Sequence, residues 1–156
     1  MNTTSKGDSK EKLAIKLVSD MGYTAEDAKR KVVWIFRNGK RVPIMQRNDY
    51  FGMFDIHGFN HERHYYVQVT HYGSQSPRMN KIKDFIAENP MPSSTRIDCW
   101  AWRGGRRRLD KRYKEKVWLP AQVFYVYRFE NGEWSLLHMM DKEGNVPDDM
   151  VDDGDE

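Results

Sequence analysis

Apolar residues recur at helical spacing near the start of the chain and again in its middle. The first such stretch follows a polar start over residues 1–8 and ends at Gly22. The second begins at Ser76-Pro77 and ends at Asn89-Pro90, where proline cannot continue a helix. A shorter helical turn is predicted over residues 24–31, with Thr24 as its N-cap. The apolar face of the second helix predicts core packing and consists of Met79, Ile82, Phe85 and Ile86.

Runs of β-branched and aromatic residues predict strands elsewhere in the chain. Asn38-Gly39 is a strong hairpin signal, and Asn131-Gly132 predicts a second hairpin near the end. A turn at residues 60–63 separates two further runs, of which the second has few charges, as is typical of a central strand. The predicted strands cover residues 32–36, 41–45, 51–59, 64–70, 96–103, 123–129 and 134–139.

The order of these elements is helix, several strands, helix, strand and terminal hairpin. This order predicts an α/β fold in which a mixed β-sheet is flanked by helices and carries a C-terminal β-hairpin. A chain of 156 residues is long enough for one domain with a real core. We expect that domain to span residues 1–140 and to be followed by a disordered acidic tail over residues 141–156.

The net charge of +3 hides a strong asymmetry along the chain. Residues 141–156 contain eight acidic residues and one lysine, a net charge of −7, which leaves about +10 for residues 1–140. A basic body with an acidic tail suggests a polyanionic partner, with the tail competing for the same surface. The alternative is that the tail only keeps the protein soluble.

The chain has no apolar run that approaches the length of a membrane span, and its first residues lack the apolar core of a signal peptide. We therefore expect a cytoplasmic, intracellular protein that does not associate with membranes. Cys99 is the only cysteine and lies in an apolar strand, which predicts a buried structural thiol. The clustered histidines, His57, His61, His64 and His71, alternate between strand faces and do not predict a zinc site.

One pair of strands carries residues suited to metal-dependent hydrolysis of phosphodiesters. Such hydrolysis needs hard oxygen ligands on adjacent strands. Asp55 and Gln68 are separated by enough chain for one turn and a return strand, so their side chains can converge. Thr70 lies two positions after Gln68 and therefore points to the same face. Glu11, on the first helix, could approach from the side and hold a metal-bound water.

The arrangement over residues 6–103 resembles the PD-(D/E)XK nuclease superfamily, particularly its small archaeal and phage members related to Holliday-junction resolvases. The opening helix carries Glu11, Phe54-Asp55-Ile56 stands in place of the Pro-Asp motif, and Val67-Gln68-Val69-Thr70 stands in place of (D/E)-x-K. A helix containing Arg78, Lys81 and Lys83 follows. The resemblance implies a restriction-endonuclease-like αβββαβ core, Mg²⁺ or Mn²⁺ as cofactor, and nuclease activity on DNA.

The chain departs from that family at two positions of the motif. Gln68 replaces an acidic ligand, and its carbonyl oxygen can coordinate Mg²⁺ without contributing charge. Thr70 replaces the lysine, and a hydroxyl cannot stabilise charge as an ammonium does. Lys81 or Lys83 could supply the missing cation from the next helix, and Asp49 could supply a further ligand. The expected catalytic set is therefore Glu11, Asp55, Gln68, Thr70 and Lys81, with Asp55, Gln68 and Glu11 as metal ligands.

A second group of residues is basic and aromatic. The segment from Arg103 to Trp118 contains eight cationic residues and two acidic ones, together with Tyr113 and Trp118. Cations on a mobile arm that begins at Gly104-Gly105 would neutralise phosphates, and exposed rings could stack on unpaired bases. A solvated charged loop is the alternative. The residues expected to bind DNA are Arg103, Arg106, Arg107, Arg108, Lys111 and Arg112.

The leading hypothesis is therefore an enzyme, an Mg²⁺-dependent DNA endonuclease or resolvase-like nuclease that acts as a monomer or homodimer. A second hypothesis keeps the scaffold without the catalysis: a DNA-binding or anti-defence protein, of phage or archaeal viral type. A third is an interaction protein whose acidic tail mimics nucleic acid.

Overall fold

The computed structural model describes residues 3–28, 30–47, 49–104, 108–111, 113–119 and 121–147. These residues form a mixed α/β structure. The two helices are α1 (Thr3–Asp20) and α2 (Gln75–Glu88). The strands are β1 (Thr24–Asp27), β2 (Arg30–Arg37), β3 (Lys40–Arg47), β4 (Ile56–Phe59), β5 (His64–His71), β6 (Arg96–Trp102), β7 (Arg108–Asp110), β8 (Val117–Leu119), β9 (Phe124–Glu130) and β10 (Glu133–Met140).

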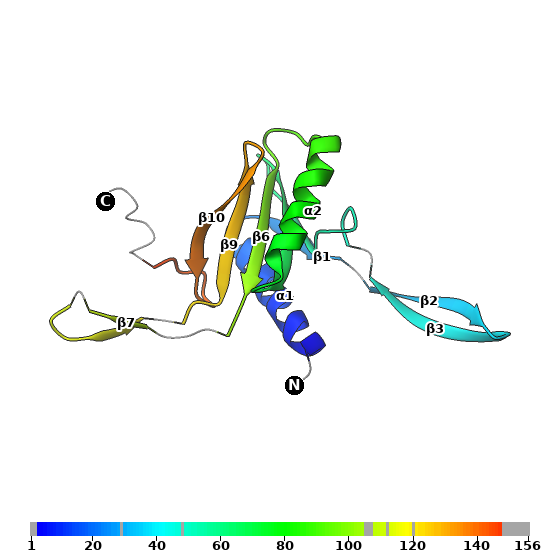
Figure 1. The fold of residues 1–156 in the computed structure, drawn as a ribbon, viewed down its shortest axis with the longest axis horizontal. Helices are drawn as coiled ribbons and strands as arrows, with labels where there is room; N and C mark the ends of the chain where they lie inside the picture. Colours follow the sequence, from blue (N-terminus) through cyan, green and yellow to red (C-terminus); the bar gives the residue numbers. More distant parts are fainter. Residues whose placement is uncertain are drawn as a thin grey trace.

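Six strands form the central sheet, in the order β1-β4-β5-β6-β9-β10 (Figure 1). Neighbouring strands are antiparallel except for β5 and β6, which are parallel and are connected through α2. A parallel pair needs a crossover of this kind because the chain must return to the same end of the sheet. The expected mixed sheet flanked by helices, with a C-terminal hairpin, is confirmed.

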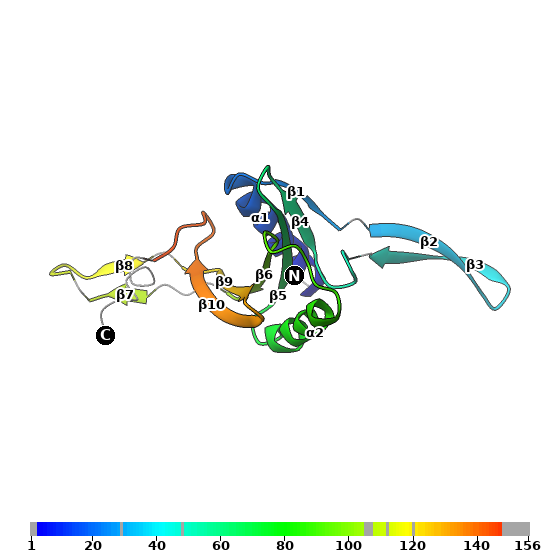
Figure 2. The same ribbon diagram turned by 90° about the horizontal axis from the view of Figure 1, so that it is seen from above.

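The two helices cover opposite faces of this sheet (Figure 2). Helix α1 buries Ala14, Leu17 and Val18 against side chains of β4, β5, β6 and β9. Helix α2 buries Ile82 on the other face, where Phe54 and Ile97 complete a smaller core. Successive residues of a strand point to opposite faces. Each central strand therefore contributes to both cores, which explains why β5 is apolar along most of its length.

Gly58 lets α1 approach the sheet closely. A Cβ atom at this position would lie 3.2 Å from the Val18 Cγ1 and 3.2 Å from the Tyr23 Cβ. A side chain at this position would therefore require Val18 or Tyr23 to shift by a few tenths of an ångström. The glycine fixes the distance between α1 and the strand that begins directly after Asp55.

Two hairpins lie outside the central sheet. Strands β2 and β3 form one two-stranded sheet, and β7 and β8 form another. Both project away from the six-stranded sheet, on different sides of the molecule (Figure 1). The Asn38-Gly39 hairpin was predicted, but the sequence did not indicate that it stands apart. The segment after Gly104 was predicted as a mobile arm, and its described residues form a hairpin that pairs Arg108↔Leu119 through Asp110↔Val117.

Two predicted elements differ locally from the structure. The helical turn predicted over residues 24–31 is wrong, because Thr24–Asp27 forms β1 and pairs along β4. Sheet pairing here outweighs local helix propensity. The strand predicted over residues 51–59 begins only at Ile56. Phe51 and Gly52 have φ values of 54° and 72°, and these left-handed conformations turn the chain before the strand starts.

The end of the described chain packs on the core. Residues 141–147, which were assigned to the acidic tail, form a turn in which the buried Asp141 accepts hydrogen bonds from the backbone of Glu143 and Asn145. Val146 packs against the α1 core. Residues 148–156 lie outside the described residues. In the part of the chain that the structure describes, no helix is long and apolar enough to cross a membrane.

A buried ion pair ties the centre of the sheet together on the α1 side. Asp98 is fully buried and accepts hydrogen bonds from Tyr65 Oη and from Arg128 Nε, the latter at 2.8 Å. Arg128 Nη2 and Trp100 Nε1 also donate to it, at 3.0 Å and 3.3 Å. The carboxylate raises the pKa of the Arg128 guanidinium, against the opposing effect of burial, and burial beside Asp98 raises the pKa of Tyr65. The three strands β5, β6 and β9 are therefore linked through one charge.

We predict that replacing Asp98 with alanine destabilises the fold by about 3–5 kcal/mol, because Arg128 would keep a buried charge without its partner. The free energy of unfolding from urea titration measures this. Glu62→Ala, which removes a pair to Arg63 at the exposed surface, serves as the control and should cost no more than about 1 kcal/mol. A loss below about 1 kcal/mol for Asp98→Ala would show that the network does not stabilise the sheet.

Candidate functional site

Asp55 and Gln68 meet where β4 begins beside β5. Asp55 directly precedes β4, and its backbone N–H donates to the Val67 carbonyl oxygen at 2.9 Å. Its Oδ2 accepts hydrogen bonds from Gln68 Nε2 at 2.7 Å and from the Val69 backbone N–H at 2.7 Å. Both side chains are 3% exposed. The turn at residues 60–63 sets this register, so the predicted convergence of the two side chains on one face is observed.

The amide of Gln68 has a defined orientation. Its Nε2 donates to Asp55 Oδ2 and also to the Val69 carbonyl oxygen at 3.1 Å. Two acceptors around one amide group identify it as the nitrogen, and Oε1 therefore faces away from them. A carboxylate at position 68 would instead bring a second negative charge against Asp55. Gln68 thus stabilises a buried carboxylate that would otherwise need a cation.

A pocket of about 390 Å³ opens beside Gln68, and Asp55 is not among its lining residues. The N-terminus of α2 borders it, and the N-cap residue, Ser74, makes no side-chain capping bond. Backbone N–H groups at a helix N-terminus favour anions. Arg78 and Lys81 add two cationic side chains, and Lys81 Nζ donates to the Gly52 carbonyl oxygen at 3.2 Å. The lining residues are Asp49, Gly52, Met53, Gln68, Ser74, Pro77, Arg78 and Lys81.

Other residues of the expected catalytic set are distributed differently. Thr70 is buried on the α2 face, and its Oγ1 makes no hydrogen bond in the described structure. Glu11 is half-buried on α1, whose core lies on the opposite face, and it does not line this pocket. Of the two lysines considered as replacements, Lys81 reaches the pocket, while Lys83 pairs with Glu133 at 3.2 Å.

Arg78 was not in the expected site, although the structure places it at the pocket. It lies three residues before Lys81, and this spacing puts both side chains on one face of α2. That spacing was the available signal in the sequence.

The positive charge of Arg78 lowers the pKa of the buried Cys99 thiol. Burial outweighs this effect and raises the pKa of the Cys99 thiol to about 12, so the expectation of a buried structural thiol is confirmed.

The donor atoms around the pocket suit a hard divalent cation. Among the described residues, no three His, Cys, Asp or Glu side chains come together as a metal-binding group. Mg²⁺ needs fewer protein ligands, since it is usually held through one or two carboxylates and keeps several waters. Asp49 and Gln68 line the pocket with a carboxylate and a side-chain amide, and the Asp55 carboxylate is hydrogen-bonded to that amide. These oxygen donors fit Mg²⁺ or Mn²⁺ and do not suit a soft metal.

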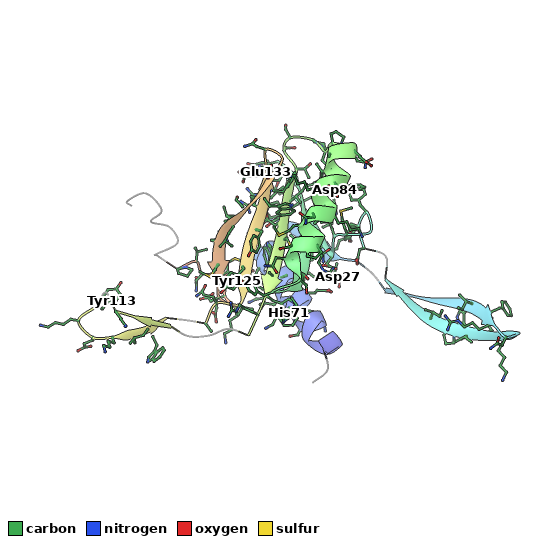
Figure 3. The ribbon with its side chains drawn as sticks, in the orientation of Figure 1. Asp27, His71, Asp84, Tyr113, Tyr125 and Glu133 are labelled. Atoms are coloured by element: carbon green, nitrogen blue, oxygen red, sulfur yellow. The ribbon has the colours of Figure 1, made fainter. Side chains whose placement is uncertain are left out.

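The residues expected to bind DNA are only partly described. Arg106, Arg107 and Arg112 lie outside the described residues, and Arg108 is described by its place in β7. Lys111 is exposed at the start of the hairpin turn. Tyr113 and Trp118 are 53% and 60% exposed, and Figure 3 shows Tyr113 on the hairpin, away from the sheet.

Arg103 differs from the rest of this basic segment because it is held against the central sheet. Its guanidinium lies 4.9 Å from the centre of the Tyr72 ring and donates to Tyr125 Oη at 3.2 Å. These contacts fix the side chain next to the end of β5. Arg103 is therefore a fixed cation at the base of the arm, whereas Lys111 is exposed on the hairpin.

Comparisons with protein-family models, curated proteins and solved structures find no significant match to this chain. What the chain does is therefore inferred from its own residues.

We predict that Gln68→Glu destabilises the protein by at least about 2 kcal/mol in EDTA, because two buried carboxylates would face each other. Millimolar Mg²⁺ should restore most of the loss, because a divalent ion between the two carboxylates stabilises the folded state by mass action. Thermal unfolding with and without Mg²⁺ measures both effects.

Asn80→Asp is the matched control, since it adds the same charge at an exposed position of α2. It should change the melting temperature little, with or without Mg²⁺. An equal loss for Gln68→Glu in EDTA and in Mg²⁺ would contradict the metal site.

Proposed function

We propose that this chain is a Mg²⁺-dependent DNA endonuclease of the resolvase-like type. The observation that carries the proposal is the junction of Asp55 and Gln68 beside a pocket that Arg78 and Lys81 line. A buried carboxylate, a neighbouring oxygen donor and two cations are the groups that phosphodiester hydrolysis requires. The pocket is open, and no aromatic side chain is among its lining residues.

The order of elements supports the same proposal. Without the β2–β3 hairpin, the chain runs α1-β1-β4-β5-α2-β6, which has the αβββαβ order implied by the resemblance to PD-(D/E)XK nucleases. The β2–β3 hairpin is then an insertion between the first two strands of that core. In this comparison Asp55 stands just before the second core strand, and Gln68 and Thr70 stand in the third.

Asp55 and Asp49 would hold the Mg²⁺ or Mn²⁺ ion, together with the Gln68 carbonyl once the amide turns so that Oε1 replaces Nε2 beside Asp55. When bound, the ion supplies Lewis-acid stabilisation of the charge that develops on the phosphate. In the absence of metal, the Gln68 amide donates a hydrogen bond to Asp55 Oδ2. Because Gln68 adds no charge, we expect this chain to need more metal than an enzyme with two acidic ligands.

The cations of α2 act on the DNA. Arg78 and the free N–H groups at the start of α2 would bind the scissile phosphate and hold it over Asp55. Lys81 would exchange its hydrogen bond to Gly52 for one to the phosphate and would stabilise charge in the transition state, the role expected of the missing motif lysine. Glu11 lies on α1, which covers the opposite face of the sheet, so it takes no part in orienting water. The basic β7–β8 segment would hold the DNA backbone outside the pocket.

A second candidate is a DNA-binding or anti-defence protein on the same scaffold. The observation in its favour is the hydrogen bond from the Gln68 amide nitrogen to Asp55 Oδ2. This bond uses the carboxylate oxygen that would otherwise contact a metal ion between the two side chains. Thr70 also brings no charge to the site. A pocket with Arg78 and Lys81 could then bind a phosphate without cutting the chain.

We predict that the protein cleaves plasmid, single-stranded or four-way-junction DNA when Mg²⁺ or Mn²⁺ is present. Asp55→Asn should lower the rate at least about 100-fold, and Lys81→Ala should lower it by about 100- to 1,000-fold, because each removes a charge that acts in the transition state. Lys83→Ala removes the same charge from the same helix outside the pocket and should cleave at nearly the wild-type rate.

The double variant Gln68→Glu with Thr70→Lys separates the two candidates. If the natural protein is an enzyme, restoring both charges should raise its activity. If neither protein cuts DNA although both bind it and remain folded, the scaffold is a binding protein and the endonuclease proposal is wrong.

A further inference from the structure

The β2–β3 hairpin stands clear of the rest of the molecule. Figures 1 and 2 show it extending from the edge of the central sheet, and Figure 3 shows the side chains of its outer part away from the rest of the molecule. Its turn is well formed, with Asn38 and Gly39 at φ values of 52° and 75°. None of its described side chains belongs to either core. Its described side chains, residues 34–44, are exposed except for the half-buried Ile35, Val42 and Ile44.

One face of the hairpin carries large exposed rings. Trp34 is 53% exposed and Phe36 is 78% exposed. They are two residues apart, so they point to the same face. Their partners across the hairpin are Pro43 and Arg41, and the Arg41 guanidinium lies 4.8 Å from the centre of the Trp34 ring. Two neighbouring aromatic side chains that stay this exposed in the folded chain indicate a surface that contacts a partner.

The charge of the hairpin indicates the chemistry of that partner. Residues 30–47 contain no Asp or Glu and six cationic residues, namely Arg30, Lys31, Arg37, Lys40, Arg41 and Arg47. A polyanion is attracted to this charge. A second copy of the same hairpin would be repelled by it, and a neutral apolar partner would gain nothing from it. The rings and the cations together fit a chain that carries both phosphates and flat bases.

We propose that the β2–β3 hairpin binds single-stranded nucleic acid. Unpaired bases stack on Trp34 and Phe36, while Arg37, Lys40 and Arg41 contact the neighbouring phosphates. In a regular duplex each base is already stacked between its neighbours, so the rings would have no free base to contact. The hairpin therefore favours unpaired strands, including those at branched junctions.

This inference goes beyond the proposed nuclease activity because it needs neither the pocket nor a metal. The hairpin and the site occupy different parts of the chain, so each can fail without the other. Asp55→Asn should abolish cleavage and leave binding to the hairpin unchanged.

Fluorescence anisotropy in EDTA tests the proposal, with fluorescein-labelled dT20 and a 20-base-pair blunt duplex as probes. The double variant Trp34→Ala with Phe36→Ala keeps every charge, and we expect it to bind dT20 about 10-fold more weakly or worse, with little change for the duplex. Phe59→Ala is the control, since it removes another exposed ring, 47% exposed, from β4 in the central sheet. It should bind both probes as the wild type does.

A charge variant tests the second half of the proposal. The triple variant Arg37→Gln, Lys40→Gln, Arg41→Gln keeps both rings. In a plot of log affinity for dT20 against log salt concentration, its slope should be shallower than that of the wild type by up to about 2. Circular dichroism and the melting temperature should match the wild type for every variant, because the hairpin lies outside both cores.

Unchanged dT20 affinity in the folded ring variant would overturn the proposal. So would an equal loss for dT20 and duplex, because the rings would then not distinguish unpaired bases. A change from dimer to monomer in the ring variant with unchanged dT20 affinity, measured by sedimentation, would assign the face to a second copy instead.

Discussion

The burial of the Asp55 carboxylate is the constraint on which the candidate site depends. A charged group that is almost fully removed from water must be surrounded by hydrogen-bond donors or paired with a cation. Here the Val69 backbone N–H and the Gln68 amide supply the donors, both at 2.7 Å. These bonds hold the start of β4 in register with β5 and direct the Gln68 side chain toward the pocket. The same interaction therefore fixes the sheet and shapes the site.

A comparison with Asp98 shows why only one of the two buried carboxylates at the sheet centre suits chemistry. Asp98 lies on the α1 side, is completely buried, and is neutralised by Arg128 together with the Tyr65 hydroxyl. Because its charge is balanced within the protein, we infer that Asp98 stabilises the fold. Asp55 accepts hydrogen bonds from the Gln68 amide and the Val69 backbone N–H, and Gln68 lines a pocket bordered by Arg78 and Lys81. A ligand that enters this pocket can change the charge balance around Asp55.

Much of the architecture could be predicted because it depends on local patterns. The alternation in β5 and β6 and the Asn-Gly turns indicated strands and hairpins, and the short turn after Phe59 was enough to predict that Asp55 and Gln68 meet. Long-range relations could not be read in the same way. The pairing of residues 24–27 with β4 outweighs their helix-like sequence, and no local signal shows that β2 and β3 leave the central sheet. Glu11 was expected at the site because helical spacing does not tell which face of the sheet a helix covers.

Diffraction from crystals grown with Mn²⁺ would test the central claim, that Asp55 and Gln68 form a metal site at this pocket, most directly. Mn²⁺ scatters anomalously and takes the same oxygen ligands as Mg²⁺. We predict an anomalous peak in contact with an Asp55 carboxylate oxygen, at the side of the pocket lined by Asp49 and Gln68, and no peak there in crystals of Asp55→Asn. An ordered, open pocket with no peak at millimolar Mn²⁺, with Gln68 Nε2 still bonded to Asp55, would contradict the account.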